Sequence, residues 1–333
     1  MQLKNKSILV TGGAGFIGSH LVDLLLSLGC YVKVIDNLSN GRIDNICANK
    51  KNRQFIFIKG DIRNEKTVKK AMKDTDIVFH LACLGVRHSI RFPLENHYVN
   101  AEGTLVLLKN AYAQKVKRFV YCSSSEVYGT AKSVPMNETH PTLPCTVYGA
   151  SKLAGEAYAR AYCLTYGLET VVVRPFNTYG PRSHHEGDAG EIIPKAIVRA
   201  MNKETIFIFG NGMQTRDFTY VEDTVSGMCM AAQCDKLAGL TLNLGSGFEV
   251  SVKELAERVS KMLGVVPAKI RYLKERPGDL ERLYADYREF SKLTGWKPKI
   301  SFSEGLQRTV DWFRTRPQTP AELLKEERGI NWR

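Results

Sequence analysis

The sequence contains no apolar run that approaches the roughly 18–20 residues needed to span a membrane, and no signal-peptide hydrophobic region precedes its first strand. We therefore expect a soluble, cytoplasmic protein without a membrane partner. No C-x-x-C pair and no histidine cluster with zinc-ligand spacing is present, so no metal site is expected. The eight cysteines are predicted to be reduced and mostly buried thiols: Cys30, Cys47, Cys83, Cys122, Cys145, Cys163, Cys229 and Cys234.

Long basic runs are also missing, although 47 lysines and arginines against 34 acidic residues give a formal net charge of +13. The longest cluster is Lys50-Lys51-Asn52-Arg53, and the other basic residues are scattered. This distribution disfavours nucleic acid as a partner and suits a small anionic substrate. The 44% hydrophobic and 24% charged residues are ordinary for a globular chain, and 333 residues suggest about two domains.

Short apolar segments alternate with helical patterns through the first half of the chain. Expected strands lie at 7–10, 31–35, 55–58, 77–81, 118–122 and 170–174, and expected helices at 16–28, 98–114 and 148–166. This alternation predicts an α/β fold with a Rossmann-type, doubly wound parallel sheet. We expect a cofactor domain over 1–176 to which later segments return, a smaller domain over 177–316, and a charged, peripheral tail over 317–333.

The first strand runs into a glycine-rich turn, Thr11-Gly-Gly-Ala-Gly-Phe-Ile-Gly18, that opens a helix. In this context Gly12 permits a tight turn, Gly15 lets a pyrophosphate approach backbone N–H groups, and Gly18 allows close helix packing. Asp36 ends the second strand, where a carboxylate accepts hydrogen bonds from a ribose diol and repels a 2′-phosphate. The pattern therefore favours NAD over NADP. Further cofactor contacts are expected from the turn and from the later strand ends, at Phe16, Ile17, Asn37, Asp61, Ile62, Leu81 and Ala82.

Tyr148 and Lys152 are four residues apart, one turn along a predicted helix. A lysine ammonium beside a phenol lowers the pKa of the phenol, so Tyr148 is a candidate base for a sugar hydroxyl. The segment Ser123-Ser-Ser-Glu-Val-Tyr-Gly129 follows the fifth strand, at the sheet edge where open α/β sheets bind ligands.

With these motifs, the chain resembles the NAD-dependent nucleotide-sugar epimerases and dehydratases of the extended short-chain dehydrogenase/reductase family. The resemblance covers about residues 5–315. It also rests on His80-Leu-Ala82, Arg174-Pro-Phe-Asn-Thr-Tyr-Gly-Pro-Arg182, Arg216-Asp-Phe218 and Arg276-Pro-Gly-Asp279. It implies a smaller C-terminal sugar-nucleotide-binding domain, and a homodimer that pairs the helices near 98–114 and 148–166.

The resemblance also implies roles for individual residues. Ser124 would hydrogen-bond the sugar C4 hydroxyl, Tyr148 would be the base, and Lys152 would hold the nicotinamide ribose. Asn177 would contact the phosphate of the sugar nucleotide, and Arg216 and Arg276 would pair with its diphosphate. Two further arginines are candidate substrate residues: Arg182, which ends its motif, and Arg87, which is placed to bind a C6 carboxylate.

The shared first step of the family is oxidation at C4, and residues 125 and 126 bear on the fate of the 4-keto sugar. Epimerases of the family carry small residues there, glucose-type 4,6-dehydratases carry Asp-Glu, and mannose-type dehydratases and uronate decarboxylases carry Ser-Glu. Ser125 and Glu126 favour a 4,6-dehydratase in carbohydrate biosynthesis, with a 4-epimerase and a UDP-glucuronate decarboxylase as alternatives. A catalytically silent NAD-binding sensor is the non-enzyme alternative. The Ser183-His-His-Glu186 segment is interpreted as a loop near the sugar.

Overall fold

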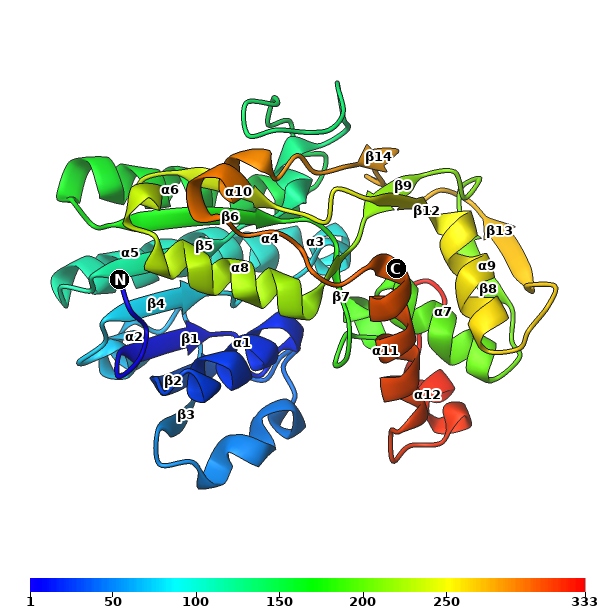
Figure 1. The fold of residues 1–333 in the computed structure, drawn as a ribbon, viewed down its shortest axis with the longest axis horizontal. Coiled ribbons are helices and arrows are strands. Elements are labelled where there is room, and N and C mark those ends of the chain that lie inside the picture. The colour runs from blue at the N-terminus through cyan, green and yellow to red at the C-terminus, as the bar shows by residue number, and fades with distance from the viewer. Residues whose placement is uncertain (333) are drawn as a thin grey trace.

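A seven-stranded parallel sheet forms the centre of the larger lobe in the computed structural model, which describes residues 1–332 (Figure 1). The sheet runs in the order β11-β6-β5-β4-β1-β2-β3. Its strands are β1 (Ser7–Thr11), β2 (Tyr31–Asp36), β3 (Phe55–Lys59), β4 (Ile77–His80), β5 (Arg118–Cys122), β6 (Thr170–Pro175) and β11 (Thr241–Leu244). The predicted Rossmann-like α/β fold is confirmed. The seventh strand comes from beyond residue 176 and pairs with β6.

Strand β1 has β2 on one side and β4 on the other, so the strand order reverses at this point. In register, Thr11 at the end of β1 lies beside Ile35 of β2 and His80 of β4. Open sheets bind ligands beyond the carboxyl ends of their strands at such a reversal. The topology therefore places the glycine-rich turn after β1 at the expected binding edge.

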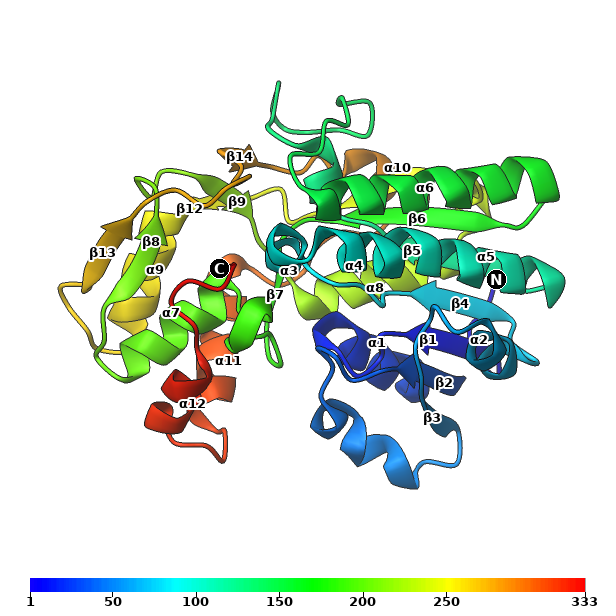
Figure 2. The same ribbon diagram turned by 180° about the vertical axis from the view of Figure 1, so that it is seen from behind.

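Helices cover both faces of the sheet (Figures 1 and 2). Helix α1 packs against α8 on one face, and α5 packs against α2 and α6 on the other. The helices of the first face are α1 (Phe16–Ser27), α8 (Val221–Gln233) and α10 (Arg288–Thr294); those of the second are α2 (Glu65–Met72), α3 (Val86–Arg91), α4 (Pro93–His97), α5 (Gly103–Ala113) and α6 (Val147–Tyr166). Each face has its own apolar core, because strands buried on both sides carry apolar side chains in both directions.

In two segments the secondary structure differs in detail from what the sequence predicts. The expected helix over 98–114 is a π-helical turn, Tyr98–Glu102, continuous with α5. The segment over 83–92, between the expected strand at 77–81 and the expected helix at 98–114, contains the short helix α3. The remaining short helical turns are η1 (Ile43–Lys51), η3 (Ser125–Tyr128), η4 (Gly187–Ala189) and η5 (Asp235–Leu237).

The smaller lobe is built from residues after β6. Helix α7 packs against α9, and α11 and α12 pack against α7. Its helices are α7 (Ile192–Met201), α9 (Val252–Met262), α11 (Phe302–Arg314) and α12 (Pro320–Glu326). Its strands are β8 (Ile206–Phe209), β9 (Thr215–Asp217), β12 (Glu249–Ser251), β13 (Ile270–Leu273) and β14 (Arg282–Leu283). A separate short pair, β7 (Thr178–Tyr179) and β10 (Thr219–Tyr220), lies beside the lobe.

The C-terminal segment is not the peripheral tail that its charge and prolines suggest. Thr319 and Glu322 form a capping box that starts α12, and Leu323 is fully buried. Beyond the helix, Trp332 packs edge-on against Phe209 of β8, with ring centroids 4.4 Å apart. A few well-placed apolar residues and a cap therefore anchor a segment of polar average composition.

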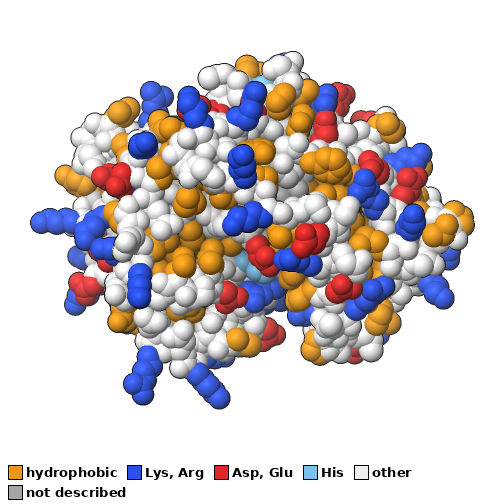
Figure 3. Space-filling model, viewed as in Figure 1, with side chains coloured by type: hydrophobic (Ala, Val, Ile, Leu, Met, Phe, Trp, Pro, Cys, Tyr) orange, Lys and Arg blue, Asp and Glu red, His pale blue; other side chains and the backbone are white. Residues whose placement is uncertain are grey.

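No helix within residues 1–332 is long and apolar enough to cross a membrane. On the face shown in Figure 3, lysine and arginine side chains are spread over the surface and do not gather in one patch.

Candidate active site

A cavity of about 960 Å³ lies between the lobes, beyond the carboxyl ends of the central strands. Its lining includes every site residue predicted from the sequence except Arg182. Residues from both lobes contribute, which is typical of ligand sites in two-lobed α/β proteins. The fold thus brings the cofactor motif and the chemical motif to one cleft.

The glycine-rich turn leaves no space for side chains. Gly12 has a φ of +70°, and a Cβ there would lie 2.7 Å from the backbone nitrogen of Ala82. A Cβ at Gly18 would lie 2.1 Å from the carbonyl oxygen of Gly12. No side chain caps the N-terminus of α1, which follows at Phe16. The turn and the helix N-terminus therefore form a cradle suited to a pyrophosphate.

Asp36 is 7% exposed at the end of β2 and faces the same cleft. Its two carboxylate oxygens accept hydrogen bonds from the backbone N–H groups of Ala14, at 3.0 Å, and Leu38, at 2.8 Å. Burial raises the pKa of Asp36, and these two donors oppose the rise. Because a carboxylate has about four acceptor positions, capacity remains for a ribose diol.

Other predicted cofactor contacts surround this carboxylate. Asn37 donates a hydrogen bond to Asp61, whose pKa is lowered by its hydrogen bonds from the Arg63 side chain. The N–H groups of Leu81 and Ala82 donate to the Thr11 hydroxyl, which fixes the end of β4 against β1. Ile17 and Ile62 line the cleft beside them.

Helix α6 carries Tyr148 and Lys152 into the cleft. The Thr146 side chain caps its N-terminus by accepting a hydrogen bond from Gly149 N–H. The Lys152 ammonium is 2% exposed, donates to the Cys122 carbonyl at 2.8 Å, and lies 6.0 Å from the Tyr148 ring centroid. The helix and the end of β5 thereby hold the two side chains beside each other.

The pKa of Tyr148 lies above its ordinary value, which corrects the expectation of a phenol lowered toward neutrality. Burial is the main cause of the rise. The Lys152 ammonium and the Ser124 hydroxyl both oppose it. The protein alone therefore supplies only part of the stabilisation that the phenolate needs.

A buried ion pair supports this site and was not predicted from the sequence. Arg174 of β6 binds both carboxylate oxygens of Glu156, which lies on α6 one turn beyond Lys152. Glu156 also accepts a hydrogen bond from Ser123, the residue before Ser124. The pair thus joins α6, β5 and β6. Its only sequence signal was the spacing of Tyr148, Lys152 and Glu156, every fourth residue on one helix face.

The predicted acid, Glu126, faces a group of arginines. Burial raises the pKa of Glu126, and Arg276 and Arg216 oppose the rise. Within residues 1–332, no group donates a hydrogen bond to the Glu126 carboxylate or forms an ion pair with it. Ser125 lies beside it in the same helical turn and is 3% exposed.

Two of the predicted substrate residues, Arg216 and Arg276, lie in the smaller lobe. Arg216 of β9 and Arg276 both bind Asp279, and the buried Nε of Arg276 has no hydrogen-bond partner in the described chain. Asn177 donates to the Asp217 carbonyl at 3.3 Å. Burial lowers the pKa of Arg87 to about 10, and its side chain lines the cleft from α3.

Arg182 is the exception among the predicted residues. It has a φ of +66°, and its guanidinium pairs with Asp23 of α1 at 2.8 Å. It does not line the cleft, and its ion pair connects the loop after β7 to α1. The sequence pattern revealed neither the left-handed backbone at this position nor the ion pair with α1.

Cleft residues that were not predicted come mostly from the C-terminal half. Among them are Glu191, Lys195 and Arg199 around α7, Phe207 and Phe209 of β8, Asp279, and Arg328, Asn331 and Trp332 of the C-terminal segment. Residues 1–332 contain no group of three or more His, Cys, Asp or Glu side chains that could hold a metal ion.

Comparison with known proteins identifies the family. The family model described as GDP-mannose 4,6 dehydratase matches residues 9–309. The chain belongs to the NAD-dependent nucleotide-sugar epimerases and dehydratases of the extended short-chain dehydrogenase/reductase family.

Relatives within this epimerase/dehydratase family have different activities. A putative UDP-glucose 4-epimerase of Methanocaldococcus jannaschii is 37% identical over 315 residues, covering 94% of this chain and 100% of the relative. A dTDP-glucose 4,6-dehydratase of Actinoplanes sp. is 33% identical over 316 residues, covering 92% and 97%. Among solved structures, the dTDP-glucose 4,6-dehydratase DesIV of Streptomyces venezuelae, as a double mutant with NAD bound, has a TM-score of 0.88 at 32% identity, covering 93% and 97%.

The cofactor of this epimerase/dehydratase family member is therefore NAD, and the protein is an enzyme. The glycine cradle and the acceptor capacity of Asp36 fit an adenine dinucleotide without a 2′-phosphate. The similarity in sequence and fold does not separate dehydratase from epimerase.

Proposed function

We propose that the protein is a nucleoside-diphosphate-hexose 4,6-dehydratase. The observation that carries this proposal is Glu126, a carboxylate that lines the cleft and has no hydrogen-bond or ion-pair partner within residues 1–332. A 4-epimerase needs no acid or base beyond Tyr148. A dehydratase needs one at C5 and C6 of the sugar.

Oxidation at C4 would use the residues at the end of β5 and the start of α6. Ser124 hydrogen-bonds the C4 hydroxyl, and Tyr148 accepts its proton. Before this transfer Tyr148 is a phenolate, which the Lys152 ammonium stabilises, and Lys152 also holds the cofactor ribose. Bound NAD supplies a hydride acceptor at C4 and a hydride donor later in the same cycle, so no external oxidant or reductant is needed.

Dehydration would then depend on Glu126. The 4-keto group acidifies the C5 proton, which Glu126 removes. The same carboxylic acid then gives a proton to the departing C6 hydroxyl, which leaves as water. Glucose-type dehydratases have an aspartate at the position of Ser125. This chain has a serine there, so the Glu126 carboxyl group serves both steps. A pKa raised by burial suits this double role, because it makes the protonated form of Glu126 easier to reach.

The nucleotide part of the substrate would lie against the smaller lobe. Arg216 and Arg276 are suited to a diphosphate, because guanidinium groups bind phosphate oxygens bidentately. Asp279 neutralises one of the two charges and holds both side chains. Asn177 and Arg87 complete the proposed substrate contacts at the edge of the sugar site.

A 4-epimerase is the second candidate, and the activity named for the Methanocaldococcus jannaschii relative favours it.

The distinguishing experiment is mass spectrometry of the products formed from UDP-, GDP- and dTDP-sugars. Loss of one water supports the dehydratase. Unchanged mass with altered chromatographic retention supports the epimerase, and loss of carbon dioxide from a uronate would assign a decarboxylase. No conversion with NAD bound would point to a silent NAD-binding protein.

We also propose a cytoplasmic location. All eight cysteines are free thiols in the structure, and such thiols persist in a reducing compartment.

A further inference from the structure

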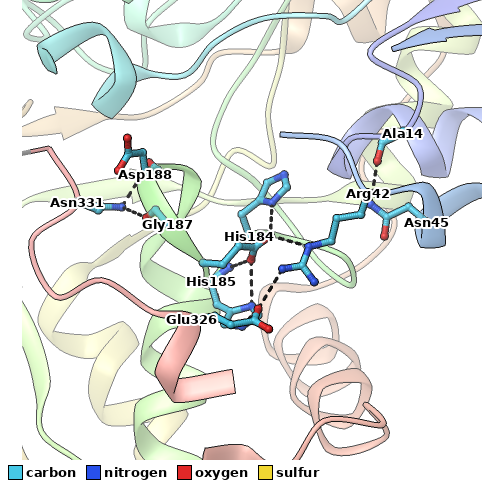
Figure 4. A network of polar contacts seen from close by, with 10 residues as sticks. Ala14, Arg42, Asn45, His184, His185, Gly187, Asp188, Glu326 and Asn331 are labelled. Carbon is cyan, nitrogen blue, oxygen red and sulfur yellow. Dashed lines mark hydrogen bonds and ion pairs between the residues drawn. The ribbon is translucent and has the colours of Figure 1, made fainter. Parts of the chain in front are cut away.

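Three segments that are distant in the sequence meet at the rim of the cleft (Figure 4). The loop after β2 contributes Arg42, the loop before α7 contributes Glu186, and α12 contributes Glu326. Arg42 Nε donates to Glu186 at 3.0 Å, and Arg42 Nη2 donates to Glu326 at 3.0 Å. His185, which is 4% exposed, lies 3.1 Å from Glu186 and 3.4 Å from Glu326. We refer to Arg42, Glu186 and Glu326 as the rim bridge.

The Arg42 end of the rim bridge is connected to the cofactor carboxylate. Arg42 N–H donates to the Ala14 carbonyl at 3.0 Å, and the Asn45 side chain donates to the same oxygen at 2.9 Å. Ala14 N–H in turn donates to Asp36 at 3.0 Å. A Cβ at Gly41 would lie 2.9 Å from both Asp36 oxygens, so the loop that carries Arg42 runs directly beside this carboxylate.

The other end of the rim bridge is held firmly by the smaller lobe. Glu327, whose side chain is 1% exposed, pairs with Lys195 at 3.0 Å and with Arg199. The Asn331 side chain donates to the Gly190 carbonyl at 3.0 Å. These contacts attach α12 and the loop before α7 to one body. The contacts of Arg42 are weaker, since its side chain is 33% exposed.

We propose that Arg42 is a positioning residue for the cofactor, and that the rim bridge keeps NAD in the cleft between turnovers. Arg42, Gly41 and Glu186 line the same cavity as Gly12, Gly15 and Asp36. Opening that end of the cleft requires the loop after β2 to move away from the smaller lobe, which breaks both ion pairs of Arg42. A reaction that returns its hydride to the sugar needs such retention, whether it ends in dehydration or epimerisation.

The test measures cofactor release rather than turnover. The purified protein is loaded with NADH and chased with excess NAD, and the loss of NADH fluorescence gives the release rate. Each exposed ion pair contributes about 0.2–1 kcal/mol, so we expect Arg42→Gln to release NADH roughly tenfold faster, equivalent to about 1.4 kcal/mol. Glu326→Gln should give a smaller increase. Arg308→Gln is the matched control, because Arg308 is a similarly exposed arginine with two carboxylate partners, Glu222 and Glu304.

Salt dependence separates retention from a merely structural role. Ion pairs between partly exposed groups are screened by salt, so release from the wild type should accelerate with sodium chloride and release from Arg42→Gln should respond less. Arg42→Lys should restore part of the retention, because it keeps the charge but not the forked geometry. Unchanged release in both the Arg42→Gln and Glu326→Gln variants would overturn the proposal, and so would equal salt dependence of the wild type and Arg42→Gln.

Discussion

Arg216 and Arg276 share one acceptor atom: each places a guanidinium Nη2 2.7 Å from Oδ1 of Asp279. One comes from β9 and the other from the segment before β14. The shared carboxylate holds two like charges side by side, where they would otherwise repel each other. It cancels only one of them, and the pair therefore retains one positive charge for a diphosphate.

Removing either arginine should weaken binding of the sugar nucleotide. A hydrogen bond to a charged group contributes about 1.5–3 kcal/mol, which corresponds to a loss of affinity of roughly 10–100-fold. Titration calorimetry of Arg216→Ala and Arg276→Ala with a nucleotide sugar measures this loss. Bound NAD is the internal control and should be unchanged. If both variants keep the wild-type KM, these arginines do not contact the substrate.

Replacing Glu126 by Gln should stop dehydration while leaving C4 oxidation intact. The amide keeps the shape of the side chain but cannot exchange a proton. Acid–base groups contribute about 10²–10⁴-fold, and formation of the dehydrated product should fall by that factor. Absorbance of NADH should build up when substrate is added. Ser125→Ala is the comparison variant, and full turnover by Glu126→Gln would instead favour a 4-epimerase.

The Tyr148 phenol should titrate differently once Lys152 is removed. Burial raises the pKa of Tyr148 and the ammonium opposes that rise, so Lys152→Met should raise this pKa further. Because the deprotonated phenol is the active form, the rising limb of log kcat against pH should move to higher pH by about one unit or more. The profile is measured at saturating NAD. A limb that stays in place would show that Tyr148 is not the group that titrates.

Asp36 should determine the choice between NAD and NADP. Its carboxylate accepts from the ribose diol and repels a 2′-phosphate, so the wild type should bind NAD much more tightly. Asp36→Asn keeps an acceptor for one backbone N–H group and loses the charge. It should bind NAD roughly 10–100-fold more weakly and discriminate less. Equal affinity of the wild type for the two cofactors would contradict this role.

We expect a homodimer through the outer face of α4, α5 and α6. Large apolar side chains are exposed there: Leu94, Tyr98, Leu105, Tyr112, Leu164 and Tyr166. Leu164 is 74% exposed, and Leu164→Glu should shift the sedimentation coefficient to that of a monomer. Val266, 75% exposed between α9 and β13, is the matched control as Val266→Glu. A wild type that sediments as a monomer at micromolar concentration would exclude the dimer.

Much of the cofactor half followed from local sequence signals. The sequence predicted the ends of these elements to within two residues. This holds for the six strands expected before residue 176 and for the helices expected at 16–28 and 148–166. The strand and the glycine-rich turn are specified largely within about ten residues, because a Cβ at Gly15 or at Gly18 would meet the carbonyl oxygen of Gly12 in the same turn. The Tyr148 and Lys152 spacing is equally local, since one helical turn fixes it.

Only the tertiary structure decided which distant groups meet. Glu156 and Arg174 look like ordinary charged residues in the sequence, yet they form the buried pair behind Ser123. Arg182 is a candidate substrate residue within its motif, and in the structure it pairs with Asp23 of α1. The C-terminal segment resembled a tail, and it instead lines the cleft and supplies Glu326 to Arg42. The Arg182 and Glu326 contacts join segments more than a hundred residues apart, and the Glu156–Arg174 pair joins a helix to the following strand, 18 residues on. No short window of sequence therefore contains the energy that selects them.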